Sequence, residues 1–132
     1  MATGDQGAPR LTERLILVIE DSEEVRDLLT MILEEQGYRV AGVADGRDAL
    51  DRARELRPDA ITLDLELPGK GGKAIMRELQ EHAETHDIPI VVVSAFTREL
   101  QGDSRNQVSR VVPKPFYISQ IVAEVEHALA ER

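Results

Sequence analysis

Residues 15–37 read LILVIEDSEEVRDLLTMILEEQG, an aliphatic run followed by an acidic pair and an amphipathic segment. The continuous aliphatic run Leu15–Ile19 is typical of a central strand that is buried on both faces. Behind it, apolar residues recur three and four positions apart, which predicts a helix with one buried stripe made of Val25, Leu28, Leu29, Ile32 and Leu33. Ser22 is placed to cap this helix and Gly37 to end it. The stretch therefore predicts a strand followed by a helix.

The same alternation continues along the rest of the chain. Further strands are predicted at 38–43, 60–63, 90–93 and 108–112, and further helices at 49–56, 74–83 and 118–129. Between 97 and 107 the pattern is weak and predicts at most a short, irregular helix. Strands joined by helical crossovers of this length pair in parallel, with right-handed crossovers that cover both faces of the sheet. The predicted fold class is therefore α/β, a doubly wound sheet of five parallel strands.

Length and composition indicate a single folded domain. The chain has 132 residues, of which 42% are hydrophobic and 31% charged, enough apolar surface for one core and enough charge to stay dissolved. Residues 1–14 carry glycine, proline and scattered charge without any periodicity. We expect them to form a flexible lead-in and the domain to occupy residues 15–132.

Composition also argues against several classes of function. The net charge of −9 repels phosphate backbones and anionic lipid, so direct binding to nucleic acid or to a membrane is not expected. The chain has no cysteine, which excludes disulfides, thiolate catalysis and thiolate metal sites. Its apolar runs are far shorter than the roughly 20 residues of a membrane-spanning helix, and no basic and apolar leader precedes them. The expected localisation is the cytoplasm.

Polar residues follow four of the predicted strands directly. Glu20 and Asp21 follow the first strand, Asp64 the third, Ser94 the fourth and Lys114 the fifth. In doubly wound sheets the ligand crevice lies beyond the carboxyl ends of the strands, so we expect these side chains to share one rim. Carboxylates that lie so close together repel one another unless a cation neutralises them. Mg²⁺ fits best, because it takes one or two carboxylates, keeps several waters and leaves positions for phosphate oxygens.

Asp64 ends the middle strand and is the candidate nucleophile at this rim. A carboxylate can accept a phosphoryl group as an acyl phosphate, and the reaction needs mainly positioning and charge neutralisation. Lys114 can then pair with one phosphoryl oxygen, and the Ser94 hydroxyl can donate to another. Taken singly, Asp21 is better explained as a helix cap, Lys114 as a solvated charge and Ser94 as a strand-end hydroxyl. Their convergence favours the chemical interpretation.

Two other patterns carry weaker hypotheses. His82 and His86 lie four residues apart and could share a metal, but no third ligand is evident, so we favour a place near the carboxyl end of a helix. His127 is expected to face solvent. The glycines at 69, 71 and 72 favour a turn after Pro68 rather than a phosphate cradle, because no GxxxxGKS/T motif is present. No nucleotide site is expected.

These residues at these spacings resemble the receiver domain of response regulators, the phosphoryl-accepting part of two-component signalling. The match runs from residue 15 to 132 and is carried, in order, by the acidic pair at 20–21, PDAITLD at 58–64, LPGKGG at 67–72, IPIVVVSA at 88–95 and VPKPF at 112–116. The resemblance implies a flavodoxin-like (βα)5 fold with strand order 2-1-3-4-5. It also implies a signalling protein, not an enzyme, apart from its own phosphotransfer and autodephosphorylation.

The resemblance further implies that Asp64 is the phosphorylation site. Asp21 would bind Mg²⁺ directly, Glu20 would bind it largely through water, and the main-chain carbonyl of Glu66 would be the third protein ligand. The side chain of Glu66, like that of Phe96, occupies a place that tunes access and phosphoryl lifetime in the family.

The resemblance also implies a switch and a set of partners. Ser94 and Lys114 would register the phosphoryl group and move the loops around them. The donor would be a sensor histidine kinase or a histidine phosphotransfer protein. A downstream protein target would bind the face formed by residues 97–107, 108–112 and 118–129, and the chain could also form a homodimer.

Three features depart from the family pattern. Glu20 stands where Asp is commoner, which lengthens the reach to the metal. Val111 stands three residues before Lys114, where the family usually keeps an aromatic that swings inward on phosphorylation. The segment between Ser94 and Lys114 lacks the usual Gly-Ala signature and is slightly short.

Two alternatives stay open. A receiver-like scaffold that binds partners without phosphorylation is made plausible by Val111 and the irregular segment 97–107. A Mg²⁺-dependent phosphohydrolase with Asp64 as nucleophile is weaker, because haloacid-dehalogenase-type phosphatases place Asp-x-Asp after their first strand, whereas Asp64 follows the third and is followed by Glu66. Since no output domain follows Arg132, we expect the chain to act through protein partners or to be a piece of a longer one.

Overall fold

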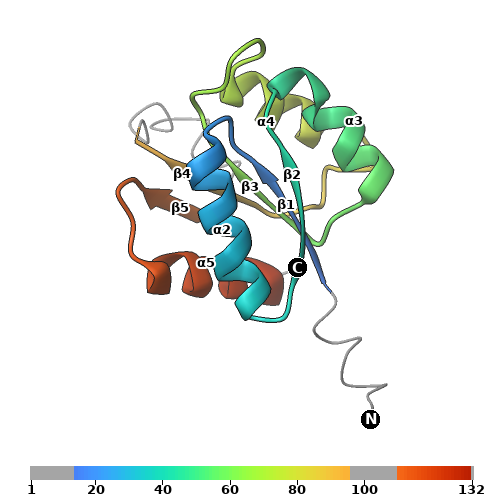
Figure 1. Cartoon of the computed structure of the whole chain (residues 1–132). Helices are drawn as coiled ribbons and strands as arrows, with labels where there is room; N and C mark the ends of the chain where they lie inside the picture. The colour runs from blue at the N-terminus through green and yellow to red at the C-terminus, as the bar shows by residue number, and fades with distance from the viewer. Residues whose placement is uncertain (1–13, 96–109, 132) are drawn as a thin grey trace.

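The computed structural model describes residues 14–95 and 110–131 (Figure 1). Most of the proposed lead-in, Phe96 and the weakly patterned segment 97–107 lie outside these residues. In chain order the elements are β1 (Leu15–Ile19), α2 (Glu23–Glu35), β2 (Arg39–Val43), α3 (Gly46–Leu56), β3 (Ala60–Leu63), α4 (Gly72–Glu81), β4 (Ile90–Ser94), β5 (Arg110–Pro113) and α5 (Ile118–Ala130).

The sheet has five parallel strands in the order β2-β1-β3-β4-β5, which confirms the predicted fold class and strand order. Its register brings the carboxyl ends of the strands to one edge. Ile19 of β1 lies beside Leu63 of β3, and Ser94 of β4 lies beside Pro113 of β5. The residues that follow β1, β3 and β5 therefore emerge at the same rim.

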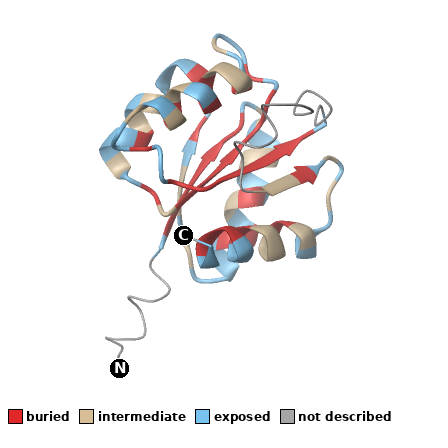
Figure 2. Ribbon diagram, turned by 180° about the vertical axis from the view of Figure 1, so that it is seen from behind, coloured by how far each residue is buried: buried red, intermediate tan, exposed pale blue. Residues whose placement is uncertain are grey.

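Helices cover both faces of the sheet (Figure 1). The pair α3 and α4 packs on one face, over a core that includes Leu17, Ile61 and Leu63. The pair α2 and α5 packs on the other face, over a core that includes Ile16 and Val18. Burying such an aliphatic side chain completely contributes about 1.5–3 kcal/mol, and Figure 2 shows buried residues throughout the central strands.

Capping residues explain where the helices begin. The Ser22 hydroxyl accepts a hydrogen bond from the Val25 amide at 3.3 Å, and α2 gives way to Gly37 with a φ of 97°, as predicted. Helix α3 begins three residues before its predicted start, because the Asp45 carboxylate accepts from the Arg47 amide at 2.8 Å and caps the helix there. Arg57 ends α3 in the left-handed region, with a φ of 49°.

Three details differ from the predicted elements. Helix α4 begins at 72 and ends at 81, so the predicted range 74–83 is wrong at its end; His82 turns to extended backbone, and the Thr85 hydroxyl donates to the Leu79 carbonyl at 2.5 Å. Leu28 is 40% exposed and Ile118 is 59% exposed, so each lies outside the buried stripe to which the periodicity assigned it. Within the described ranges, no helix is both long and apolar enough to cross a bilayer.

Candidate functional site

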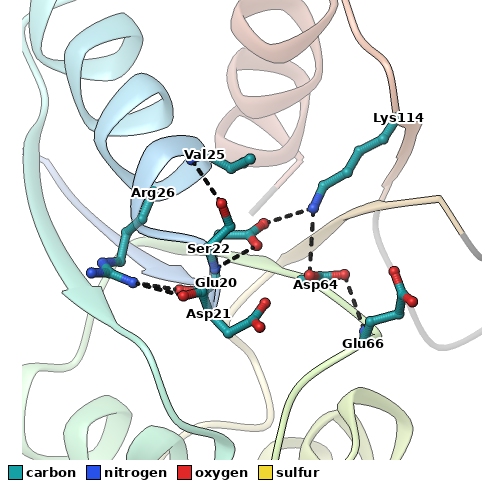
Figure 3. Close-up of polar contacts among 8 residues, drawn as sticks. All are labelled: Glu20, Asp21, Ser22, Val25, Arg26, Asp64, Glu66 and Lys114. Carbon is teal, nitrogen blue, oxygen red and sulfur yellow. Dashed lines mark hydrogen bonds and ion pairs between the residues drawn. The ribbon is translucent and has the colours of Figure 1, made fainter.

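Three carboxylates meet at the carboxyl edge of the sheet. Glu20 and Asp21 follow β1 and Asp64 follows β3, and one oxygen of each lies within 4.8 Å of the others. Glu20 is 1% exposed and Asp64 is 3% exposed, whereas Asp21 is open to solvent. Figure 3 shows these side chains gathered around one point. The predicted convergence is therefore present, with two buried acids and one exposed acid.

Lys114 completes the cluster from the end of β5. Its Nζ donates to Glu20 Oε1 at 2.9 Å and to Asp64 Oδ2 at 3.4 Å. Its backbone amide donates to the Ser94 carbonyl at 3.1 Å, so the turn that carries the lysine is tied to the end of β4. The Lys114–Pro115 peptide bond is cis. The predicted lysine thus points into the acidic cluster.

The charges of the cluster do not balance. Burial raises the pKa of Glu20, and the neighbouring Asp64 carboxylate adds to this effect, while Lys114 and the Ser22 amide oppose it. Burial acts to lower the pKa of Lys114, but its hydrogen bonds and attraction to Glu20 and Asp64 outweigh burial and raise it. Lys114 therefore stays protonated at neutral pH. One ammonium faces three carboxylates, an arrangement that suits an added divalent cation.

Backbone hydrogen bonds position the acids at the strand ends. The Glu20 amide donates to the Val43 carbonyl at 2.9 Å, and the Asp64 amide donates to the Ile19 carbonyl at 3.0 Å. These bonds extend the sheet ladder by one residue on each strand. Glu20 and Asp64 are therefore held by the sheet itself.

The turn after β3 begins at the acceptor candidate. The Glu66 amide donates to Asp64 Oδ1 at 3.1 Å, which fixes the orientation of that carboxylate, while the Glu66 side chain is exposed. Leu65 and Leu67 on either side of it are buried in the core beneath α3 and α4. This alternation leaves the main chain of Glu66 next to the cluster and its side chain in solvent.

Close glycine packing holds this turn in place. A Cβ on Gly72, at the start of α4, would lie 2.5 Å from the Leu65 Cα and 2.6 Å from the Asp64 carbonyl oxygen. A Cβ on Gly46 would lie 2.4 Å from the Lys70 carbonyl oxygen. These approaches explain why glycine stands at positions 46 and 72.

Replacing Gly72 with Ala is expected to lower the free energy of unfolding by about 1–3 kcal/mol, because backbone atoms of Asp64 and Leu65 must shift to admit the methyl group. Urea denaturation measures this loss. Gly71→Ala is the matched control, since a Cβ there meets nothing within 4 Å. Equal stability of the two variants would contradict the packing described for this turn.

Ser94 and Val111 are the two remaining residues that the sequence analysis singled out. Ser94 ends β4 and is fully buried. Val111 is partly buried and packs against the core beneath α3 and α4. The place usually held by an aromatic is thus filled by a small side chain that already faces inward.

The histidines do not form a metal site. His82 caps α4, and its Nδ1 lies 2.8 Å from the Glu78 carbonyl, while His86 is exposed and lies 3.1 Å from Asp87. In residues 14–95 and 110–131, the one group of three or more metal-ligating side chains is the acidic cluster at the sheet edge. His127 is exposed, as predicted.

Sequence reasoning missed one residue that touches the site. Arg26, on the second turn of α2, donates from Nη1 to the Glu20 carbonyl at 2.9 Å and to the Asp21 carbonyl at 3.4 Å (Figure 3). Its position near the start of α2 could have indicated this contact. Long side chains on a helix lean back toward its N-terminus, and here that direction leads to Glu20 and Asp21.

Comparisons with known proteins agree with this geometry. The family described as the response regulator receiver domain matches residues 16–126. The polar-differentiation response regulator DivK of Brucella anthropi is 32% identical over 112 residues, which cover 80% of this chain and 91% of that protein. The DNA-binding response regulator MtrA of Mycolicibacterium smegmatis is 35% identical over 116 residues, 86% of this chain and 50% of that protein. The chain thus spans about half the length of MtrA.

Solved structures show the same fold. A sensor protein from Polaromonas sp. JS666 superposes with a TM-score of 0.84 at 31% identity, covering 89% of this chain and 97% of that one. The receiver domain of a sensor histidine kinase from Pseudomonas aeruginosa PAO1, solved with a magnesium ion coordinated in its active site cleft, gives a TM-score of 0.80 at 29% identity, covering 89% and 98%. Because the family match spans most of the chain, this protein belongs to the response regulator receiver domains of two-component signalling.

Proposed function

We propose that this chain accepts a phosphoryl group on Asp64 from a sensor histidine kinase or a histidine phosphotransfer protein. The observation that carries the proposal is the buried Asp64 carboxylate, which lies within 4.8 Å of an oxygen of each of two further acids and 3.4 Å from the Lys114 Nζ. This geometry supports a role for Asp64 as nucleophile, for the acids as cation ligands and for Lys114 as the partner of a phosphoryl oxygen. We propose that this phosphoryl transfer takes place in the cytoplasm.

The residues present fit Mg²⁺. Three carboxylates within 4.8 Å of one another supply hard oxygen ligands, and the Lys114 ammonium compensates only part of their negative charge. Asp21, Asp64 and the main-chain carbonyl of Glu66 would hold the ion, with Glu20 acting largely through water. When bound, Mg²⁺ neutralises charge that develops on the phosphoryl oxygens.

The chain's own groups perform the transfer. An Asp64 carboxylate oxygen attacks phosphorus, the new O–P bond forms as the N–P bond of the donor histidine breaks, and the bonding electrons return to the imidazole. Lys114 pairs with one phosphoryl oxygen and the Ser94 hydroxyl donates to another. The Glu66 amide holds the carboxylate in the attacking orientation. Hydrolysis of the acyl phosphate later resets the site.

Phosphorylation changes the ion pairs that hold the Lys114 ammonium in place. The phosphoryl group adds about −1.5 to −2 charges beside Lys114, which can then exchange its bond to Glu20 for a stronger one. Because the Lys114 amide is bonded to the Ser94 carbonyl, movement of the lysine reaches β4 and β5. The face that includes β5 and α5 would bind a downstream protein or a second copy of the chain.

One alternative retains a specific observation in its favour. Val111 is already packed inward, so the usual aromatic reporter is absent, as it would be in a scaffold that does not depend on phosphorylation. A phosphohydrolase has no such support, because receiver domains are signalling domains rather than conventional enzymes.

Incubation with acetyl phosphate and Mg²⁺, followed by intact-mass measurement, tests the proposal. We expect one phosphoryl unit per chain, lost slowly by hydrolysis and not gained when EDTA removes the metal. Failure of both labelling and Mg²⁺ binding would favour the scaffold. Steady turnover of a small phosphate ester that Asp64→Ala abolishes would favour the phosphohydrolase.

A further inference from the structure

We propose that Arg26 is a positioning residue of the metal site, which holds the main chain of Glu20 and Asp21 so that both carboxylates face the ion. This inference rests on the proposed function, since it concerns Mg²⁺ binding at the same cluster. In this role the positively charged Arg26 guanidinium helps to assemble the site for Mg²⁺.

The guanidinium lies across the turn that carries both acids. Nη1 donates to the Glu20 carbonyl at 2.9 Å and to the Asp21 carbonyl at 3.4 Å, so one group bridges two consecutive peptide units (Figure 3). The same guanidinium is thus bonded to the peptide units of both acids. Arg26 therefore restrains the Asp21 main chain in addition to the sheet bond that holds Glu20 and the cap bond of Ser22.

The path of the arginine stem is also built into the fold. The stem crosses Gly42 on β2, where an added Cβ would lie 3.1 Å from Arg26 Cδ and 3.4 Å from Cγ. The Thr30 hydroxyl donates to the Arg26 main-chain carbonyl at 2.8 Å, a bond within α2 that does not involve the guanidinium. A glycine on the neighbouring strand thus leaves the space through which the guanidinium reaches the turn.

Positioning matters most for Asp21, because its side chain is exposed and repelled by two buried acids. Glu20 has further anchors, since its amide bonds to Val43 and its carboxylate accepts from Lys114. Without Arg26, the turn can relax and carry the Asp21 carboxylate away from the cluster. The ion would then lose a ligand that the free protein no longer holds in place.

Charge and positioning predict opposite results when Arg26 is replaced. Removing a positive charge next to a cation site strengthens Mg²⁺ binding if electrostatics alone acts. Removing a residue that orients metal ligands weakens binding, typically by a factor of 10 to 100. The sign of the change therefore separates the two roles, and a contribution to stability alone predicts neither.

Isothermal titration calorimetry of Mg²⁺ into the whole chain provides the test. For Arg26→Met, which keeps the length of the stem, we expect the Kd to rise about tenfold. Arg26→Lys retains a donor and the charge, and its Kd should lie between those of the wild type and Arg26→Met. Thr30→Val, which removes a hydrogen bond of the same helix without freeing the guanidinium, should leave the Kd unchanged.

The outcomes separate this inference from the proposed function. Absence of Mg²⁺ binding by the wild type contradicts the proposed function and removes the basis of the inference with it. Wild-type binding with an equal or lower Kd for Arg26→Met overturns the positioning role alone. If Arg26→Met does not fold by circular dichroism, Arg26→Lys decides, and a Kd equal to that of the wild type overturns the role.

Discussion

The Asp64→Asn variant is expected to gain no mass from acetyl phosphate and Mg²⁺ under conditions that label the wild type completely. The amide oxygen of asparagine carries no negative charge, so it cannot form the acyl phosphate. Asparagine has the same shape and can still accept the hydrogen bond from the Glu66 amide. The loss therefore reports on the nucleophile and not on the packing of the turn.

Two further measurements make this result specific. Asp87→Asn removes an exposed carboxylate outside the cluster and should label like the wild type. Circular dichroism should show an unchanged fold for both variants. Full labelling of Asp64→Asn would show that another residue accepts the phosphoryl group.

The Lys114→Gln variant is expected to lose about 3 kcal/mol of unfolding free energy in the absence of metal. The reason is that Glu20 and Asp64 are almost fully buried, and removing the ammonium leaves two buried carboxylates without a compensating positive charge. Breaking a buried ion pair typically costs about 3–5 kcal/mol of unfolding free energy. We expect a loss at the lower end of this range because the Lys114 side chain is 21% exposed. Urea denaturation followed by circular dichroism measures the loss.

Mg²⁺ should reverse most of that loss, since a divalent cation compensates the same carboxylates. Lys73→Gln, which removes the same charge from a lysine outside the cluster, should unfold like the wild type with and without metal. If Lys114→Gln were as stable as the wild type without Mg²⁺, the ammonium would not hold the acids together. Labelling by acetyl phosphate should also be slower, because Lys114 pairs with a phosphoryl oxygen.

The strand ends could be predicted from the sequence because the parallel register leaves little freedom. An aliphatic run that is buried on both faces fixes where its strand stops, and parallel pairing brings the stops to one edge. That is why the sequence alone predicts that Glu20, Asp21, Asp64 and Lys114 converge.

Contacts perpendicular to the strands could not be predicted in the same way. The hydrogen bonds of Arg26 depend on the space that Gly42 leaves on a neighbouring strand, which no spacing in the sequence encodes. The exposure of Leu28 and Ile118 likewise depends on how widely each helix contacts the sheet, and periodicity does not report this width. The end of α4 depends on the hydroxyl of Thr85, which lies beyond the periodic segment.

The identity of the residue that carries the phosphoryl group tests the central claim most directly. Borohydride reduces an aspartyl phosphate to homoserine, so reduction of the protein labelled in acetyl phosphate and Mg²⁺, followed by peptide mass mapping, locates the acceptor. We expect homoserine in place of Asp64 and of no other residue. A phosphoryl group found on a histidine or another aspartate, or no reduced product from a protein that binds Mg²⁺, would contradict the assignment of Asp64 as the acceptor.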